Sequence, residues 1–294
     1  MPKISVLMPV YNTAPYLMGA INSILWQTYD DLEFIIIDDG STDGSAGIIQ
    51  EIKDIRVKKI FHTEQKGVVA SLNEGLAIAQ GEYIARMDSD DITALNRLEV
   101  QALFMDENPN IDLCGTGFIT QYPGPVKIHP PHHEEIKVWL LFHCCIAHPT
   151  IMVRRSSIDR LGFSYDANYL HAEDYELWNR LAPNAQFANL PLNLYYYRIH
   201  GGQVSTKHRQ IQDYSARKIR KRQFAQMGLQ LSEEEYAIFM RLAEFRVNPG
   251  VFENYRTAAG FANWLLDQNK KYKLYNQDIL AFALSRCISG QPAY

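Results

Sequence analysis

Three aspartates directly follow an apolar stretch of the chain, which is a pattern typical of a ligand or metal site. Asp88, Asp90 and Asp91 come directly after residues 83–87, which read as a buried strand. An amphipathic segment over 94–105 follows them. In open α/β sheets, ligands bind beyond the carboxyl ends of strands, and several carboxylates there can hold a hard cation through oxygen. We therefore expect a ligand or metal site at this strand end.

A second acidic pair, Asp38 and Asp39, ends the apolar strand pattern at 34–37. Two acidic strand ends favour a single crevice. In such a crevice one carboxylate can orient a sugar hydroxyl while another holds Mg²⁺ or Mn²⁺, whose remaining positions accept phosphate oxygens. The alternative is local: Asp91 or Thr93 could cap the next helix, and Asp38 could do no more than end a tight turn.

Apolar periods of two and of 3.6 residues alternate over the first hundred residues, which predicts strands and helices in turn. Thr13 and Pro15 suit the start of the first helix. This alternation is typical of an α/β fold whose mainly parallel sheet is covered by helices on both faces. The expected strands are 4–9, 33–38, 57–61 and 83–88, and the expected helices run through 17–25, 48–52, 68–79 and 94–105.

Beyond about residue 110 the alternation gives way to a mixed pattern and then to helices alone from Lys207. Residues 122–133 are rich in proline, glycine and histidine. The histidines His129, His132 and His133 could suggest a metal, but their proline-rich setting favours a loop. Extended segments are expected at 112–119, 151–153 and 192–198, and helices at 134–142 and 173–181.

The composition is that of an ordinary globular protein, since 47% of the 294 residues are hydrophobic and 21% are charged. The formal net charge of -4 gives no general electrostatic reason to expect nucleic acid as a partner. Four cysteines without CxxC spacing predict reduced thiols rather than a disulfide framework or a zinc site. The start lacks a signal-peptide layout, and no apolar stretch approaches the ~20 residues of a membrane span. We expect a soluble, cytoplasmic protein.

Four stretches of the first hundred residues resemble the inverting glycosyltransferases of family two, which have the nucleotide-diphospho-sugar transferase (GT-A) fold. Their order and spacing make the resemblance specific. It implies a GT-A catalytic domain over 1–205, with a nucleotide-sugar-binding half at 1–110 and an acceptor-binding half at 111–205, and then a C-terminal helical region over 206–294. The matching stretches are 4–12 (ISVLMPVYN), 36–43 (IIDDGSTD), 73–75 (NEG) with 81–84 (GEYI), and 87–91 (MDSDD).

The resemblance also implies which residues bind the donor. Asp39 is expected to read the nucleobase, because a carboxylate accepts a hydrogen bond from a uracil N–H. Asp88 would contact the ribose or the donor sugar, and Asp90 would ligate the Mn²⁺ or Mg²⁺ that bridges the diphosphate. Lys66 could pair with the donor, although a solvated lysine fits the sequence equally well. The expected donor set is completed by Pro9, Tyr11, Asn12 and Ser89.

Glycosyl transfer also needs a base that takes the proton of the acceptor hydroxyl. Residues 171–178 (HAEDYELW) resemble the family's Glu-Asp motif, in which the aspartate, here Asp174, is the base. Glu173 could serve only the helix dipole, because acidic residues favour the first turn of a helix. If Asp174 is not the base, Glu173 or a histidine such as His148 is the next candidate. A single base implies one displacement with inversion, whereas retention through a covalent intermediate needs a second nucleophile.

Residues 197–205 (YRIHGGQVS) resemble the family as well. His200 is expected to complete the metal shell or to touch the diphosphate, and Arg198 to supply charge to the leaving group. The alternative for His200 is an exposed histidine in a glycine-rich turn. The stretch 207–222, with seven basic residues and one acid, could lie on an anionic membrane near a lipid-linked acceptor or form a solvated helix face. The helices beyond it are expected to pack on the catalytic domain or on a second subunit, as a homodimer.

Three other classes of protein could use the same carboxylates. A haloacid-dehalogenase-like phosphatase also places Asp-x-Asp after a strand, but near the start of its domain, whereas three strand units precede it here. A sugar nucleotidyltransferase would need an early glycine-rich basic stretch to bind a triphosphate, and the sequence has no such stretch. A non-catalytic sugar-binding module would not need both Asp90 and Asp174.

The sequence therefore predicts a metal-dependent inverting glycosyltransferase. We expect a UDP-sugar donor, rather than a GDP- or dTDP-sugar, and a glycan or lipid-linked acceptor. The resemblance alone suggests a role in cell-surface polysaccharide or lipopolysaccharide synthesis. The basic stretch 207–222 leads us to consider a peripheral position at the inner face of the membrane.

Overall fold

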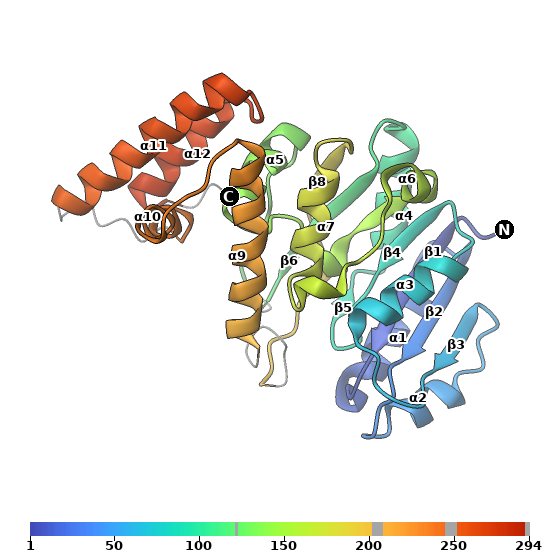
Figure 1. The fold of residues 1–294 in the computed structure, drawn as a ribbon. Coiled ribbons are helices and arrows are strands. Elements are labelled where there is room, and N and C mark those ends of the chain that lie inside the picture. Colours follow the sequence, from blue (N-terminus) through green and yellow to red (C-terminus); the bar gives the residue numbers. More distant parts are fainter. Residues whose placement is uncertain (121–122, 202–207, 245–251, 292–294) are drawn as a thin grey trace.

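The computed structural model describes residues 1–120, 123–201, 208–244 and 252–291 (Figure 1). Strands and helices alternate through the first hundred residues. The strands are β1 (Ile4–Val10), β2 (Leu32–Asp38), β3 (Val57–Phe61), β4 (Tyr83–Arg86), β5 (Ile92–Thr93), β6 (Leu113–Ile119), β7 (Met152–Arg154) and β8 (Phe187–Tyr196). The helices are α1 (Ala14–Leu25), α2 (Ser45–Glu51), α3 (Val68–Ile78), α4 (Arg97–Glu107), α5 (His133–Phe142), α6 (Arg155–Leu161), α7 (Glu173–Leu181), α9 (Arg209–Gln226), α10 (Glu233–Ala243), α11 (Phe252–Tyr272) and α12 (Gln277–Ser289), with short 3-10 turns at His148–Thr150 and Ala167–Tyr169.

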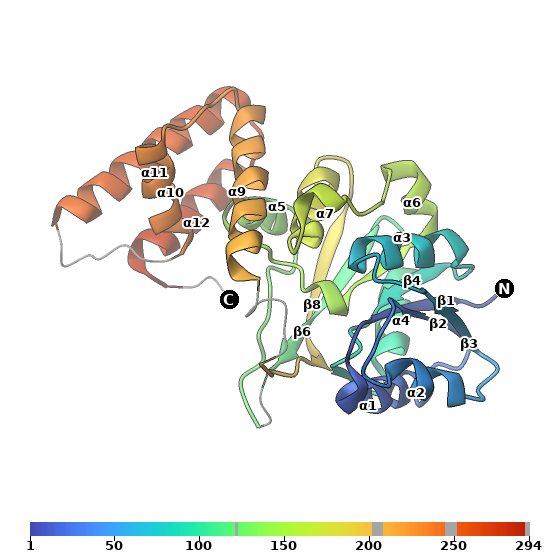
Figure 2. The ribbon, with the colours of Figure 1, turned by 60° about the horizontal axis from the view of Figure 1, so that its bottom comes forward.

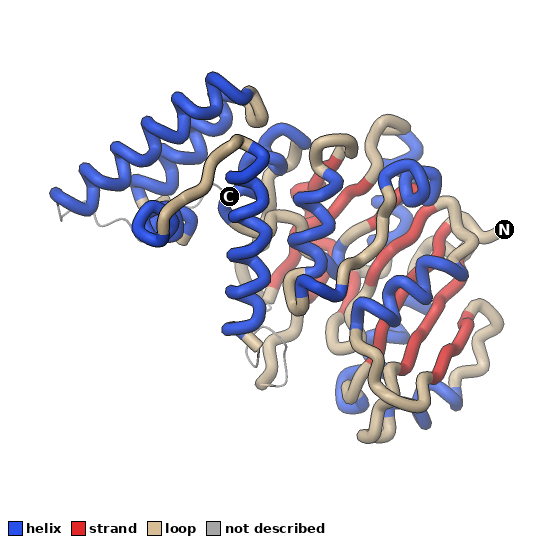
Figure 3. The backbone as a smooth tube through the Cα atoms, viewed as in Figure 1, coloured by secondary structure: helices blue, strands red, loops and turns tan. Residues whose placement is uncertain are grey.

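The strands form one sheet in the order β3-β2-β1-β4-β7-β6-β8-β5. The first four in this order are parallel, β7 is antiparallel to both of its neighbours, and β8 runs parallel to β6. Figure 3 shows the sheet between helices. Because β1, β2 and β4 are parallel neighbours, their carboxyl ends meet at one edge, which brings the two acidic strand ends together. The predicted α/β fold with a mainly parallel sheet is confirmed.

Both faces of the sheet are buried, which explains why its strands read as continuous apolar runs. Along β1, Ile4, Val6 and Met8 enter a core shared with α1, α2 and α4. Leu7 points to the opposite face, into a core shared with α3, α5, α7 and the C-terminal helices. The period of two in the sequence therefore separates the two layers of helices.

The helices and strands expected in the first hundred residues are present, with small shifts at their ends. α4 begins at Arg97, three residues later than predicted, because residues 92–93 pair with β8 as β5. Neither Asp91 nor Thr93 caps this helix, whose N-cap is Asn96. β5 and α6 were not predicted, because a two-residue strand shows no period and because the sequence of α6 (RSSIDRL) is mostly polar.

The C-terminal helices α9–α12 lie together at one side of the molecule, where α9 packs on α7 and where α10 and α12 pack on α5 (Figure 2). The basic residues of α9 are engaged within the protein. Membrane contact through this helix stays a prediction. The predicted boundary between the catalytic domain and the C-terminal helical region, at 205/206, lies outside the described residues, and so does Lys207. None of the helices in the described ranges is long and apolar enough to cross a bilayer. The partners on the protein are Glu233 for Arg217 and Lys221, Glu176 for Arg222, the Phe142 carbonyl for Arg220, the Asn168 carbonyl for Lys218 and Asp213 for Arg209.

Candidate active site

The three aspartates after β4 lie together. One carboxylate oxygen from each of Asp88, Asp90 and Asp91 is within 4.8 Å of the others. Within the described part of the chain, no other group of three His, Cys, Asp or Glu side chains could share an ion, so His129, His132 and His133 do not form one. The strand end therefore gathers negative charge in a geometry that suits a divalent cation.

Asp91 is the most deeply buried of the three, with 1% of its surface exposed. Its Oδ1 accepts a hydrogen bond of 2.8 Å from the backbone N–H of Arg198, and its Oδ2 has no hydrogen-bond partner among the described residues. Burial and the charges of Asp88 and Asp90 raise the pKa of Asp91 to about 8. A buried carboxylate oxygen without a donor is costly, and a cation would relieve that cost.

His200 approaches the same cluster from the segment after β8. Its Nε2 lies 2.9 Å from Oδ2 of Asp90. The ring of Tyr16 on α1 stacks on His200 at 4.5 Å between centroids, and the guanidinium of Arg198 lies 4.8 Å from the same tyrosine ring. The predicted metal residues Asp90 and His200 are thus in contact, and Arg198 lies beside them.

Asp39, at the end of β2, is 3% exposed and organises the segment after β3. Its two oxygens accept backbone N–H bonds of 2.8 Å from Lys66 and Gly67. The Nδ1 of His62 lies 2.8 Å from its Oδ1, and the Nε2 of this histidine lies 2.8 Å from Glu74. Burial alone would lower the pKa of His62, but these two acids raise it above its ordinary value. A carboxylate has about four acceptor positions, so one remains open on Asp39.

The other residues that the sequence predicted to bind the sugar donor lie around the ends of β1 and β4. Asn12 adopts a left-handed conformation, with φ of 53°, and its Oδ1 accepts the backbone N–H of Thr42 at 2.8 Å. The hydroxyls of Ser89 and Thr13 are 2.9 Å apart. Tyr11 is 42% exposed. Pro9 is half-buried in β1 opposite Ile37 of β2.

Asp174 lies in the first turn of α7 (Glu173–Leu181). Its Oδ1 accepts the N–H of Tyr175 at 2.7 Å, and the thiol of Cys144 lies 3.6 Å from its Oδ2. Burial raises the pKa of Asp174. The neighbouring Glu173 is 9% exposed, and burial together with Asp174 raises its pKa to about 7. A basic, partly desolvated carboxylate is suited to proton transfer near neutral pH.

His148, the next candidate for the base, is buried under the same helix. Its Nε2 lies 2.8 Å from the hydroxyl of Tyr165, and its ring lies near Trp178. Burial lowers the pKa of His148 well below its ordinary value. The imidazole is therefore neutral but engaged with Tyr165. Trp178 is fully buried and belongs to the core.

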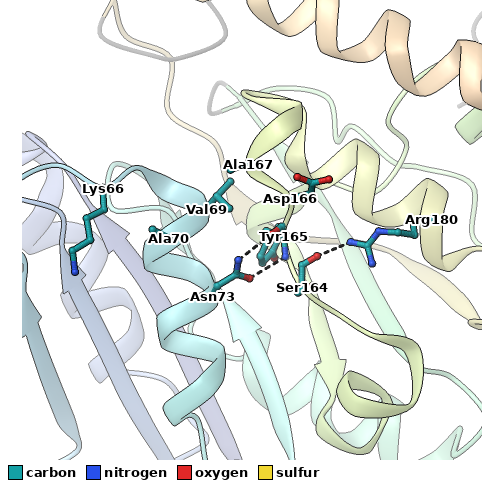
Figure 4. Close-up of a pocket in the computed structure, with 9 residues that line it drawn as sticks. All are labelled: Lys66, Val69, Ala70, Asn73, Ser164, Tyr165, Asp166, Ala167 and Arg180. Atoms are coloured by element: carbon teal, nitrogen blue, oxygen red, sulfur yellow. Dashed lines mark hydrogen bonds between the residues drawn. The ribbon is translucent and has the colours of Figure 1, made fainter.

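A pocket of about 520 Å³ opens beside the site between α3 and the segment before α7 (Figure 4). Lys66 and Arg180 lie at its opposite ends. Between them the side chain of Asn73 exchanges two hydrogen bonds of 2.9 Å with the backbone of Tyr165. The amide of Asn73 thus connects α3 to the segment that leads to Asp174.

Some residues of the site were not predicted from the sequence. Arg86 pairs with Asp88, Tyr16 stacks on His200, and the hydroxyl of Tyr195 accepts the backbone N–H of Asp88 at 3.2 Å. The one available signal was an arginine within the apolar run before the aspartates. The two tyrosines come from α1 and β8, and only the tertiary fold brings them to β4.

The sequence is similar to known glycosyltransferases. The profile of the family described as "Glycosyl transferase family 2" matches residues 5–162, more than half of the chain. An uncharacterized glycosyltransferase of Haemophilus influenzae is 34% identical over 234 residues, which cover 75% of this chain and 72% of that protein. The Escherichia coli protein named UDP-Glc:alpha-D-GlcNAc-diphosphoundecaprenol beta-1,3-glucosyltransferase WfaP is 32% identical over 206 residues, which cover 70% of this chain and 80% of the relative.

Solved structures share the fold. S. aureus TarS 1-349 in complex with UDP-GlcNAc aligns with a TM-score of 0.62 at 20% identity, covering 99% of this chain and 93% of that one. The mannosyltransferase PcManGT from Pyrobaculum calidifontis, in complex with GDP-Man and Mn²⁺, aligns with a TM-score of 0.60 at 19% identity, covering 98% and 86%. As the motifs of the first hundred residues predicted, the chain belongs to glycosyltransferase family 2 and is a glycosyltransferase with the GT-A fold.

Proposed function

We propose that this glycosyltransferase moves a sugar from a UDP-sugar to a glycan or lipid-linked acceptor, with inversion and with the help of Mn²⁺ or Mg²⁺. The observation that carries the proposal is the gathering of Asp88, Asp90 and Asp91 within 4.8 Å at the carboxyl end of β4. The name of the WfaP relative specifies UDP-Glc, and one structural relative was solved with UDP-GlcNAc. Both support a uridine donor.

The possible metal ligands of the site suit a hard divalent cation. They offer carboxylate oxygens with one imidazole, and one buried oxygen of Asp91 has no partner among the described residues. Asp90 and His200 would hold the ion. When bound, the ion would supply positive charge to the diphosphate oxygens of the leaving group.

The protein's own residues would orient the donor. Asp39 has one open acceptor position for a uracil N–H, next to Pro9, Tyr11 and Asn12 at the end of β1. Asp88 and Ser89 would bind the ribose or the donor sugar. Arg198, above Tyr16, would offer positive charge to the departing diphosphate, and Lys66 would pair with the donor from the segment that Asp39 holds.

Asp174 would act as the base. The acceptor oxygen forms a bond to the anomeric carbon while the bond from that carbon to the diphosphate oxygen breaks. The acceptor's proton passes to the carboxylate of Asp174, and the nucleoside diphosphate leaves with the electron pair. One displacement inverts the anomeric centre.

The setting of the reaction belongs to the same proposal. The name of WfaP describes a lipid-diphosphate-linked acceptor, and the chain is 37% identical to an O-antigen biosynthesis glycosyltransferase of Escherichia coli named WbnJ. These names support a role in surface polysaccharide synthesis. A position on the cytoplasmic side with peripheral membrane contact is part of the same proposal. Pairing of two subunits through the C-terminal helices remains part of the expectation.

The proposal is tested by isothermal titration calorimetry with UDP and Mn²⁺. Wild-type protein should bind UDP more tightly with Mn²⁺ than with EDTA, and Asp90→Asn should lose that difference because an amide attracts a cation less than a carboxylate does. Glu82→Gln, an exposed acid at the start of β4, is the matched control and should keep it. Tight binding of GDP and not UDP would overturn the uridine assignment, and metal-dependent binding by Asp90→Asn would place the ion elsewhere.

A further inference from the structure

One buried cation lies among the acids of the site. Arg86 ends β4 in register with Leu7 of β1 and is 8% exposed, with the fully buried Ala85 and Met87 on either side of it. An apolar side chain would fit this setting at no electrostatic cost. Burial of a guanidinium is unfavourable unless its charge is paired and hydrogen-bonded, so its partners indicate its role.

Arg86 holds Asp88 with both arms of its guanidinium. Nη1 donates to Oδ2 of Asp88 at 2.6 Å, and Nη2 lies 2.5 Å from Oδ1. Two parallel bonds fix the plane as well as the position of a carboxylate. The backbone of Arg86 is fixed too, because its N–H donates to Ile151 and its carbonyl accepts a bond from Arg97. Asp88 is therefore locked against a rigid strand end.

The same guanidinium also acts on the other side of the site. Burial raises the pKa of Asp174, and Arg86 is a cation that opposes this rise. It acts in the same direction on Glu173. The other titratable groups that face Asp174 are acids or neutral: Glu173 beside it on α7, Asp88 after β4, Cys144 after α5 and Tyr165 before α7.

We infer that Arg86 is a positioning residue for the transfer reaction: its guanidinium fixes the carboxylate of Asp88 on the donor side and supplies the positive charge that leaves Asp174 free to take the acceptor's proton. This inference rests on the proposed function, because it needs Asp88 and Asp174 in the roles given above. In this role Arg86 would act through the carboxylates of Asp88 and Asp174. One buried charge would thus serve both halves of the site.

Two properties of the Arg86 side chain, its positive charge and its ability to make two parallel hydrogen bonds, can be separated by substitution. Arg86→Lys keeps a positive charge but cannot make two parallel bonds, so it should disturb Asp88 while sparing Asp174. Arg86→Gln loses the charge, so it should affect both. A residue that only fastened β4 to the segment after it would lower thermal stability without changing how activity depends on pH.

The experiment compares kcat, KM and their pH dependence, measured as UDP release with Mn²⁺ from whichever of UDP-glucose, UDP-galactose and UDP-N-acetylglucosamine is turned over. In Arg86→Lys, kcat should fall by roughly tenfold, and the acidic limb of kcat against pH should stay in place. In Arg86→Gln, that limb should move by about one pH unit toward alkaline pH, because a neighbouring cation has been removed. UDP affinity with Mn²⁺ should stay within about tenfold of wild type in both, since Asp90 and His200 remain.

Arg154→Gln is the matched control. Arg154 is a half-buried arginine of β7 that donates to the Met105 carbonyl at 2.7 Å, away from the aspartates. Its loss should lower the melting temperature and leave kcat and the acidic limb unchanged.

Distinct results overturn the inference and the proposed function. Folded Arg86 variants with wild-type kcat and an unmoved acidic limb would overturn the inference. So would a failure of both variants to fold, which would assign Arg86 to stability alone. If wild-type protein binds no UDP with Mn²⁺, it is the proposed function that fails, before any variant is compared.

Discussion

Two adjacent carboxylates at the start of α7 differ in their surroundings. Oδ1 of Asp174 accepts a backbone N–H, and its Oδ2 lies beside the thiol of Cys144. Glu173 is more buried, and its Oε2 has no hydrogen-bond partner among the described residues. Its pKa of about 7 leaves Glu173 partly protonated at neutral pH. Asp174, which is less buried than Glu173, is therefore the better candidate of the two to meet an acceptor.

Asp174→Asn should lower transfer by roughly 10²–10⁴-fold while the fold and the affinity for UDP with Mn²⁺ stay near wild type. The amide can still accept the N–H of Tyr175, so the start of the helix is preserved, but it cannot take a proton. Initial rates of sugar transfer and calorimetry with UDP measure the two effects. Glu173→Gln is the control. If Asp174→Asn transfers at a near-wild-type rate and Glu173→Gln does not, the base is Glu173.

At the scale of single residues, local motifs predicted the acids of the site but not their partners. Asp90 and Asp174 lie in short motifs, and the order of these motifs along the chain indicates the family. The contacts of His200 with Asp90 and Tyr16 join residues about 110 and 180 positions apart along the chain, and such pairs depend on sheet order. That order cannot be obtained from periodicity alone, because it depends on which strands pair across long connections.

At the scale of elements, Gly81 controls how β4 enters the sheet. Its N–H donates to the hydroxyl of Ser5 at 2.8 Å, and a Cβ added to Gly81 would lie 2.7 Å from the backbone carbon of Ile4 and even closer to the N of Ser5. Backbone atoms of β1 cannot move aside as a side chain could.

Gly81→Ala should therefore destabilise the protein by roughly 1–3 kcal/mol through this overpacking. Gly47→Ala in α2 is the opposite case, because a Cβ there meets nothing within 4 Å, and it should stabilise the helix by about 0.5–1 kcal/mol. Urea unfolding followed by circular dichroism gives both free energies. Equal effects of the two substitutions would mean that the close approach of Gly81 to β1 does not limit stability.

Most elements that the sequence predicted have enough residues to show a period, and the three-residue β7 is an exception. β1, α1 and α7 were predicted to within a few residues, whereas β5, with two residues, has no pattern of its own and forms only because β8 offers it a partner. The same pairing delays α4. Tertiary contacts thus decide the short elements, and local periodicity decides the long ones.

At the scale of the whole molecule, one buried acid joins the catalytic part to the C-terminal helices. Glu176 on α7 is 1% exposed, and its Oε1 accepts bonds from Arg180 at 3.0 Å and from Arg222 on α9 at 2.8 Å. Glu176→Gln should destabilise the protein by about 2–4 kcal/mol, because two guanidinium groups lose a buried counter-charge.

Urea unfolding measures this loss, and UDP affinity with Mn²⁺ should not change. Glu233→Gln is the matched control, since Glu233 pairs with Arg217 and Lys221 of the same helix but is exposed to solvent. It should change stability little. A loss in the control as large as that of Glu176→Gln would show that burial of the acid is not what matters.

The stability of the whole protein should also depend on pH through Glu173. Its pKa rises from an ordinary value of 4.5 to about 7 in the folded protein, chiefly through burial. The folded state therefore holds this proton more tightly than the unfolded state does, so the contribution is favourable below about pH 4.5 and is lost as the pH rises to about 7. A shift of this size corresponds to roughly 3 kcal/mol. Glu173→Gln cannot lose a proton. Urea unfolding in EDTA should therefore find the variant increasingly more stable than wild type between pH 5 and pH 8, and a difference that does not vary with pH would mean that Glu173 is not held protonated by its burial.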